Sequence, residues 1–266
     1  MNQIADVKPT VSRTYNLPLV EDCSGLPEAP QFTDNEWKPL PERFLAGIEF
    51  ASRFTAVPVD GPHTYYIAAI HVSGKRATTT DGKTLVEFDL GGAVPCDMSL
   101  TVQEMRVLRA FGTSPSHVSK LRGTDSRLHF RWVTGASLAL KPTGYTAPPA
   151  VRSLVAKLDW SGMNPVDALW RGQIVGQFSV KPDRDQTDLL HVHPDRIESS
   201  AYGSQSQVRL PLTTHSPVYT VYDRPQIIRA IKIAEQVKFV ERPEGTFFQF
   251  SAENIRGVVS SMAVRA

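Results

Sequence analysis

Two histidines on one expected strand have the spacing in this sequence that best fits metal chemistry. His191 and His193 lie two residues apart in DLLHVHPD, and alternate residues of a strand point to the same face. Imidazole is a common zinc ligand, and Asp188 or Asp195 is the nearest third ligand. Solvent-facing histidines are more common on strands than metal sites, which favours an ordinary surface. A hydrolase or metal enzyme remains the third interpretation of this chain.

Other catalytic patterns are missing from the sequence. It has no GxxxxGK[ST] phosphate loop, no GxGxxG and no GxSxG elbow, and Gly203-Ser204-Gln205 is a polar turn. The charged run Asp183-Arg184-Asp185 is typical of a loop. The remaining histidines, for which the sequence suggests no partner, are His63, His71, His117, His129 and His215. The sequence therefore predicts no catalytic residue, no cofactor and no metal.

Composition indicates an ordinary globular protein. The 266 residues are 41% apolar and 21% charged, enough for one large or two ordinary domains. No apolar run approaches the ~18 residues of a membrane span, and the N-terminus lacks the plan of a signal peptide. Cys23 and Cys96 have no paired spacing, which favours a reducing, cytoplasmic location. Residues 1–42 carry seven acids and three bases, which leaves a net charge of +6 on the remainder.

The pattern of apolar residues predicts the same order of elements twice. Expected helix starts at Pro41 and Pro165 lie 124 residues apart, and those at Thr101 and Asp223 lie 122 apart. A Pro-rich joint separates the halves, so we expect an N-terminal extension over 1–36 and domains over 37–146 and 147–266. Helices between runs of hairpins predict an α+β fold, in which helices cover one face of antiparallel sheet.

The expected elements follow from apolar spacing and turn residues. Helices are expected with inward residues that include Phe44, Ile48, Ala51, Met105, Leu108, Phe111, Leu169, Ile174, Ile227 and Ile231. Strands are expected over 65–70, 76–80, 84–88, 117–121, 127–133, 137–142, 188–192, 196–202, 207–210, 218–221, 238–241, 247–251 and 257–264. Asp81-Gly82, between two β-rich runs, predicts a tight type I′ hairpin turn.

The amino-acid sequence around that hairpin is more specific than a tight turn requires. ATTTDGKTLV, following YYIAAI, resembles the middle domain of the bacterial DNA polymerase sliding clamp. FLAGIEFASRF, DMSLTVQEMRVLRAF and LHFRWVTGASLALKPTGYTAPP resemble further parts of that domain in the same order. VYTVYDRPQIIRAIKIA and the terminal VVSSMAVRA are similar to the last helix and last strand of the clamp's final domain. The resemblance runs from Trp37 to the C-terminus.

This resemblance implies a DNA-clamp fold and a non-enzymatic processivity factor. Such rings encircle duplex DNA without reading sequence, and they bind peptides of the polymerase and the clamp loader. Two domains per chain imply a homotrimer, as in divergent, phage-type clamps, in the cytoplasm of a bacterium or a phage-infected host. The alternative is a clamp-fold adaptor that binds proteins without encircling DNA.

The resemblance also implies two sets of site residues. Residues expected to face DNA are Tyr65, Tyr66, Arg43, Arg53, Arg106, Arg109, Arg171, Arg224, Arg229 and Lys232. Residues expected to line the partner-peptide pocket are Thr64, Ile67, Thr80, Gly82, Lys83, Thr84, Leu85, Met262, Ala263 and Val264. The family has His-Arg where this chain has Lys83-Thr84, and Pro where it has Ala263, so the partner motif is expected to differ.

Overall fold

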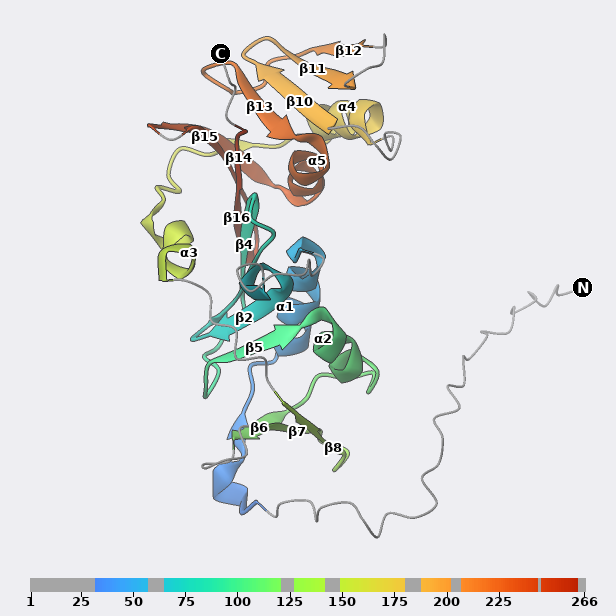
Figure 1. The fold of residues 1–266 in the computed structure, drawn as a ribbon, viewed down its shortest axis with the longest axis vertical. Coiled ribbons are helices and arrows are strands. Elements are labelled where there is room, and N and C mark those ends of the chain that lie inside the picture. The colour runs from blue at the N-terminus through green and yellow to red at the C-terminus, as the bar shows by residue number, and fades with distance from the viewer. Residues whose placement is uncertain are drawn as a thin grey trace, which may run out of the picture.

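The computed structural model describes residues 32–56, 65–120, 127–141, 149–179, 188–201, 207–243 and 245–262. Three antiparallel sheets follow one another along its longest axis (Figure 1). The predicted boundary at 146/147 lies outside these residues, as does most of the expected N-terminal extension.

The same order of elements occurs twice. The first repeat contains β1 (Lys38–Pro39), α1 (Phe44–Ala51), β2 (Ala69–Ser73), β3 (Arg76–Thr80), β4 (Thr84–Asp89), β5 (Met98–Thr101), α2 (Val102–Arg109), β6 (His117–Lys120), β7 (Leu128–Arg131) and β8 (Ser137–Leu140). The second repeat contains β9 (Asn164–Pro165), α4 (Ala168–Phe178), β10 (Asp188–His193), β11 (Arg196–Ala201), β12 (Gln207–Pro211), β13 (Thr220–Asp223), α5 (Arg224–Ile233), β14 (Gln236–Arg242), β15 (Gly245–Ala252) and β16 (Ile255–Ser260).

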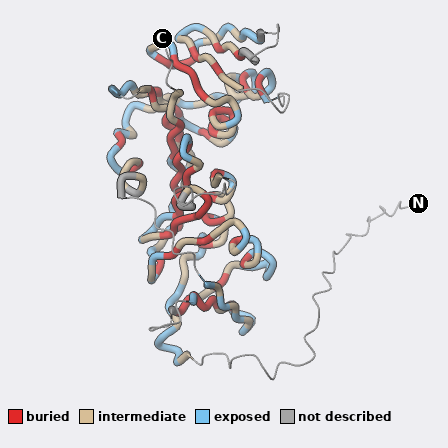
Figure 2. Tube along the Cα trace, viewed as in Figure 1, coloured by how far each residue is buried: buried red, intermediate tan, exposed pale blue. Residues whose placement is uncertain are grey.

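A single sheet joins the two repeats. Its strand order is β5-β2-β3-β4-β16-β15-β14-β9, and the join is the antiparallel pair β4·β16, in which Glu87 lies opposite Arg256. The remaining strands form two four-stranded sheets, β1-β6-β7-β8 and β12-β11-β10-β13, at opposite ends of the molecule (Figure 1). Burial is concentrated along β4 and β16 (Figure 2).

The helices begin where their capping residues place them. Thr101 caps α2, because its hydroxyl accepts the N–H of Glu104 while the Glu104 carboxylate accepts the N–H of Thr101. The Asp167 carboxylate caps α4 by accepting the N–H of Trp170 at 2.6 Å. The second repeat's helix therefore starts three residues after Pro165, where the sequence pattern predicted its start.

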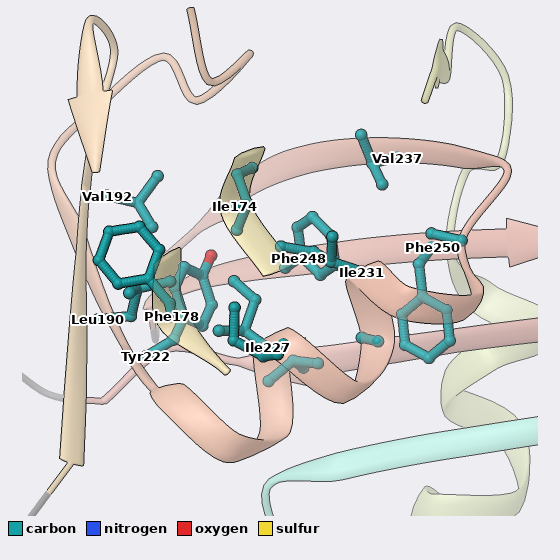
Figure 3. Close-up of a cluster of buried hydrophobic side chains, with 14 of the residues drawn as sticks. Ile174, Phe178, Leu190, Val192, Tyr222, Ile227, Ile231, Val237, Phe248 and Phe250 are labelled. Atoms are coloured by element: carbon teal, nitrogen blue, oxygen red, sulfur yellow. The ribbon is translucent and has the colours of Figure 1, made fainter. Parts of the chain in front are cut away.

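The largest buried cluster lies mainly in the second repeat. Phe178 of α4 and Ile227 and Ile231 of α5 pack against Phe248 and Phe250 of β15 (Figure 3). Burying large apolar side chains such as these contributes about 1.5–3 kcal/mol each. Phe54 and Val86 of the first repeat belong to the same cluster, so the core is continuous across the join.

Several local predictions were wrong for identifiable reasons. Tyr65–Ala68 is a 3-10 helix, so β2 begins only at Ala69. Leu169 is 71% exposed because it lies five residues before the buried Ile174, about 140° around the helix. Phe111 is 40% exposed, although its ring stacks on Trp132 at 4.0 Å.

The Thr-Asp-Gly hairpin turns one residue later than predicted. Asp81 lies opposite Thr84, so the two turn residues are Gly82 and Lys83. Gly82 has φ +89°, while Asp81 and Lys83 have negative φ, which fits a type II′ rather than a type I′ turn. The Asp81 carboxylate accepts the N–H groups of Lys83 and Thr84 at 3.0 and 2.7 Å, which fixes the tip.

Candidate functional site

The tip of this hairpin contacts the second repeat. The Lys83 ammonium lies 2.5 Å from the Asp223 carboxylate at the start of α5. The backbone N–H of Ser260 donates to the carbonyl of Lys83 at 2.9 Å, and the Thr84 hydroxyl donates to Gln226 at 3.3 Å. The hairpin that carries the resemblance therefore lies at the join of the two repeats.

An apolar cluster lies on the outer face of the joining sheet, the face away from α1 and α5. It consists of Leu85, Val155, Leu158 and Val258, which are 1–6% exposed. Leu85 of β4 lies opposite Val258 of β16, so both repeats contribute to it. Trp160 and Phe247 pack at its rim.

A segment just after the Pro-rich joint, for which the sequence pattern predicted no element, supplies half of this cluster. It contains α3 (Pro149–Leu154) and the 3-10 helix η4 (Val155–Lys157). Pro149 at the helix start and apolar residues at 151, 154, 155 and 158 have helical spacing, which would have predicted this element. The prolines nearby obscured that signal.

Polar contacts hold this segment on the sheet. The Lys238 ammonium donates to the Asp159 carboxylate at 3.0 Å and to the Ser161 carbonyl at 2.8 Å. The Arg256 guanidinium lies 5.4 Å from the centre of the Trp160 ring, within cation–π range. Hydrogen bonds from Ser161, with Lys238 beside it, lower the pKa of Asp159 below its usual range.

The structure brings together only part of the expected peptide pocket. Leu85 belongs to the apolar cluster, whereas Ile67 and Met262 are half-buried outside it. Thr80 and Thr84 are buried, and Gly82 and Lys83 are exposed at the hairpin tip. Thr64, Ala263 and Val264 lie outside the described residues. The residues of this cluster and its rim that the resemblance missed are Val151, Leu154, Val155, Leu158, Trp160, Phe247 and Val258.

An open polar cavity of about 430 Å³ also lies at the join. Its lining includes Arg76, Glu87, Asp89, Asn254 and Arg256. The Arg76 guanidinium donates to the Glu87 carboxylate at 2.6 Å, and the Glu87 side chain is only 5% exposed. Burial raises the pKa of Glu87 above its usual range, although Arg76 and then Arg256 oppose the shift.

This raised pKa predicts a pH-dependent stability. The folded protein binds the Glu87 proton more tightly than the unfolded chain, so this group's contribution to unfolding free energy falls as pH rises from about 4.3 through the raised pKa. In urea unfolding, the stability of Glu87→Gln relative to the wild type should therefore be higher at pH 8 than at pH 4.5. The exposed Glu241→Gln is the control, and an equal difference for Glu87→Gln at both pH values contradicts the prediction.

The opposite face of the joining sheet carries the helices. α1 packs on β3 and β4, while α5 packs on β15 and β16. Arg53, Arg106, Arg109 and Lys232 are exposed there, whereas the exposed Arg43 donates to the side chain of Asn254 in the turn between β15 and β16. Arg109 also lies 3.2 Å from the Glu49 carboxylate, which ties α2 to α1.

Other expected DNA-facing residues have structural contacts. Arg224 forms an ion pair with Asp188, and the two side chains are only 11% and 8% exposed, so its expected role on DNA does not fit. Arg171 donates to the carbonyl of Ala234. Arg229 donates to the Arg53 carbonyl at 2.8 Å and lies over the ring of Phe54. The side chains of Tyr65 and Tyr66 lie outside the described part.

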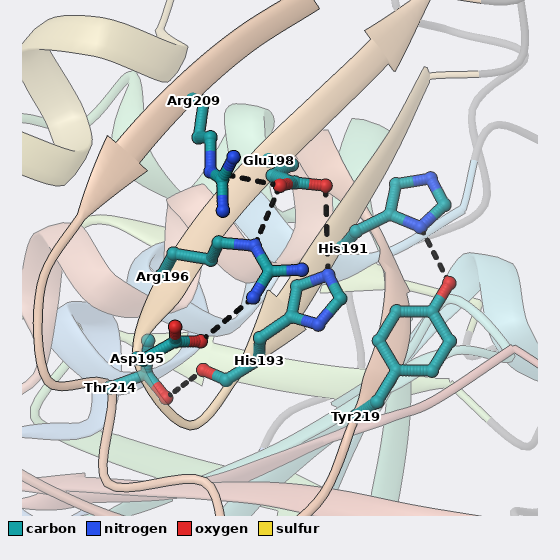
Figure 4. Close-up of polar contacts among 8 residues, drawn as sticks. All are labelled: His191, His193, Asp195, Arg196, Glu198, Arg209, Thr214 and Tyr219. Carbon is teal, nitrogen blue, oxygen red and sulfur yellow. Dashed lines mark hydrogen bonds and ion pairs between the residues drawn. The ribbon is translucent and has the colours of Figure 1, made fainter.

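The two histidines share the outer face of β10 (Figure 4). His191 Nδ1 lies 2.7 Å from the Tyr219 hydroxyl, and His193 Nε2 lies 3.6 Å from Glu198, which also contacts two arginines. Desolvation lowers the pKa of His191. Within the described ranges, no group of three or more histidine, cysteine or acidic side chains could hold a metal ion. The metal-enzyme interpretation therefore finds no site there.

Comparison with known proteins places this fold. The sequence matches no protein-family model and no curated protein. The structure matches a DNA polymerase sliding clamp from Pseudomonas aeruginosa with a TM-score of 0.64 at 13% identity, over 91% of this chain and 70% of that one. A Caulobacter crescentus sliding clamp matches with a TM-score of 0.63 at 17% identity, over 89% and 68%. The DNA polymerase III beta chain of Streptococcus pneumoniae matches with 0.64 at 13%, over 92% and 69%. This chain has the sliding-clamp fold.

The sliding-clamp fold confirms the α+β class and the fold expected from the hairpin and the terminal strand. In the part of the chain that the structure describes, no helix is long and apolar enough to cross a membrane.

Proposed function

We propose that this protein is a sliding clamp that encircles duplex DNA and tethers a polymerase to it, without catalysis of its own. The observation that carries the proposal is that α1, α2 and α5 lie on one face of the joining sheet, with exposed arginines and a lysine on or beside them. Positive charge on such a face attracts phosphates without reading bases. In this proposal, three copies of the chain form the ring around DNA, and the ring acts in the cytoplasm.

The proposed site for polymerase and clamp-loader peptides lies on the other face. The apolar cluster lies there, and both repeats contribute to it, since Leu85 of β4 is opposite Val258 of β16. A peptide could place one or two apolar anchors beside Leu158 and Trp160 and gain affinity from few contacts. Lys83, which contacts the Asp223 carboxylate and stands with Thr84 where the family has His-Arg, would form the polar edge of this site.

Charge reversal on the helical face tests the DNA-binding part. Arg106→Glu with Lys232→Glu should weaken binding to a fluorescent 30-base-pair duplex by tenfold or more, because each reversed charge removes an attraction to phosphate. The loss of these phosphate contacts should also reduce the salt dependence of binding. Fluorescence anisotropy at 50 and 200 mM salt measures both effects.

Lys75→Glu with Arg242→Glu is the matched control, because both residues are exposed and lie in turn or strand ends away from the helices. Equal weakening by the two double variants would show that net charge alone drives binding. Binding by neither the wild type nor the control at low salt would favour the adaptor that does not encircle DNA.

A further inference from the structure

Residues 158–161, the cover segment, lie across the outer face of the joining sheet. α3, which precedes this segment, lies on the side of that sheet opposite α1 and α5 (Figure 1). Lys238 of β14 contacts Asp159 and the Ser161 carbonyl, while Arg256 of β16 lies over the ring of Trp160. Because β15 runs between β14 and β16, the cover segment passes over β15.

The cover segment is attached to the sheet by side chains rather than by strand pairing. Within the described residues, no strand pair includes residues 155–163. The backbone N–H of Leu158 and the indole N–H of Trp160 both donate to the carbonyl of Val155, at 3.4 and 2.9 Å, so these hydrogen bonds are local. The segment can therefore leave the sheet without breaking backbone pairing between strands.

A buried amide lies beneath the cover segment. Gln249 of β15 lies opposite Val258 on one side and Lys238 on the other, and it is completely buried. Its chain neighbours Phe248 and Phe250 belong to the core under the helices, so Gln249 points to the outer face. In the part of the chain that the structure describes, neither Oε1 nor Nε2 of Gln249 has a hydrogen-bond partner. Burying such an amide is unfavourable because it loses its hydrogen bonds to water.

We propose that the cover segment occupies the site of a partner peptide, and that Leu158, Asp159 and Trp160 represent the chemistry of that peptide. An extended peptide with an apolar, an acidic and an aromatic residue in succession takes their places when the segment moves aside. Its apolar anchors then lie on Leu85 and Val258, which the segment keeps buried. This inference rests on the peptide site proposed above, and it states what covers that site and what fits it.

A free peptide has one advantage over the cover segment, and the segment has another. The segment is tied to η4 on one side and to β9 on the other, and in that position it leaves the Gln249 amide without a partner. A free peptide lacks these two attachments, so its backbone can approach Gln249 and form a hydrogen bond. The tethered segment has a high effective concentration at the site, so it stays in place until such a partner is present.

The charges around β15 favour an acidic residue in the peptide. Lys238 and Arg256 lie on the two strands beside β15, and both contact the cover segment. Glu87 lies opposite Arg256 in the sheet, but Arg76 already binds its carboxylate at 2.6 Å. A peptide carboxylate therefore meets Lys238 once Asp159 withdraws, whereas a peptide lysine would meet two cations.

A peptide copied from the chain itself tests the competition. In the opened variant, Leu158→Ala, Asp159→Lys and Trp160→Ala together remove the contacts of the cover segment and leave the sheet unchanged. Fluorescein-labelled AKLDWSG, the sequence of residues 156–162, should bind the opened variant at least tenfold more tightly than the wild type in fluorescence anisotropy. AKANASG, which lacks the three side chains, should bind neither protein.

Three outcomes of this assay would overturn the proposal. They are equal affinity of AKLDWSG for the two proteins, equal affinity of the two peptides for the opened variant, and no binding of AKLDWSG to the opened variant at 1 mM. Hydrogen exchange of β15 and β16 checks that the opened variant is folded. If it is not, Asp159→Lys alone, at an exposed residue, replaces it and should still strengthen binding about threefold.

Gln249→Leu in the opened variant separates a binding role from burial alone. It should weaken binding of AKLDWSG by about fivefold, which corresponds to one hydrogen bond, without loss of stability in urea unfolding. Lys238→Met should weaken binding similarly, whereas the matched control Lys75→Met, at an exposed turn, should not. Unchanged affinity of Gln249→Leu would overturn the role of this amide.

The duplex assay described above separates this inference from the proposed function. The opened variant should bind the 30-base-pair duplex as tightly as the wild type, because its helical face is unchanged. Duplex binding without peptide binding would overturn the cover segment's role and leave the clamp proposal standing. Peptide binding without duplex binding would support the cover segment's role and count against the clamp.

Discussion

Arg224→Met is expected to lower the free energy of unfolding by about 3–5 kcal/mol. Arg224 and Asp188 form an ion pair whose side chains are 11% and 8% exposed. Removing the guanidinium leaves the carboxylate of Asp188 largely buried without its charged partner, and that desolvation cost is not recovered. Urea unfolding followed by tryptophan fluorescence measures the loss. The pair links β10 to the start of α5.

Two further variants separate this charge effect from other causes. Lys232→Met on the same helix removes an exposed charge, and it should change stability by less than about 0.5 kcal/mol. Arg224→Met combined with Asp188→Leu removes both charges and should recover most of the loss. If Arg224→Met lowers the unfolding free energy by no more than Lys232→Met does, the ion pair contributes nothing to stability.

Leu85→Ala is expected to cost about 2–5 kcal/mol of unfolding free energy. Leu85 is 4% exposed beneath Val155 and Leu158, so truncation removes buried surface and leaves a cavity between β4 and η4. The resemblance placed this leucine in the lining of the partner-peptide pocket. Its burial instead predicts a loss of stability together with any loss of peptide binding.

Leu169→Ala is the matched control, since the same truncation at a 71% exposed leucine should be nearly neutral. Met262→Ala, at a half-buried position, is the better variant for peptide binding because it should spare the fold. Equal stability of the Leu85 and Leu169 variants in urea would show that η4 does not seal the cluster.

Local signals in the sequence predicted much of the fold. Thr101 before an apolar stripe indicated α2, and the stripe around Ile227 and Ile231 indicated the buried face of α5. Signals of this kind depend on neighbouring residues, so spacing reveals them. The 3-10 turn at Tyr65–Ala68 was not predicted because its tyrosines and isoleucine are residue types enriched in strands.

The candidate site was harder to predict because its decisive contacts are distant in sequence. The resemblance implied a pocket role for Leu85, but its cross-strand partner Val258 is 173 residues away and its cover comes from η4. Arg224 has the spacing of an exposed helix residue, and only the fold places Asp188 beside it. A resemblance carries over positions, but it does not state which side chains a particular chain has buried.

The shared sheet means that the repeated unit and the folding unit of this chain are different. β4 and β16 each obtain half of their backbone partners from the other repeat, and Phe54 and Val86 reach into the other repeat's core. Neither half could unfold without exposing a long, apolar strand edge in the half that remained. The two repeats should therefore unfold in one cooperative transition. If the two halves are produced separately, they should associate as complementary fragments of one domain.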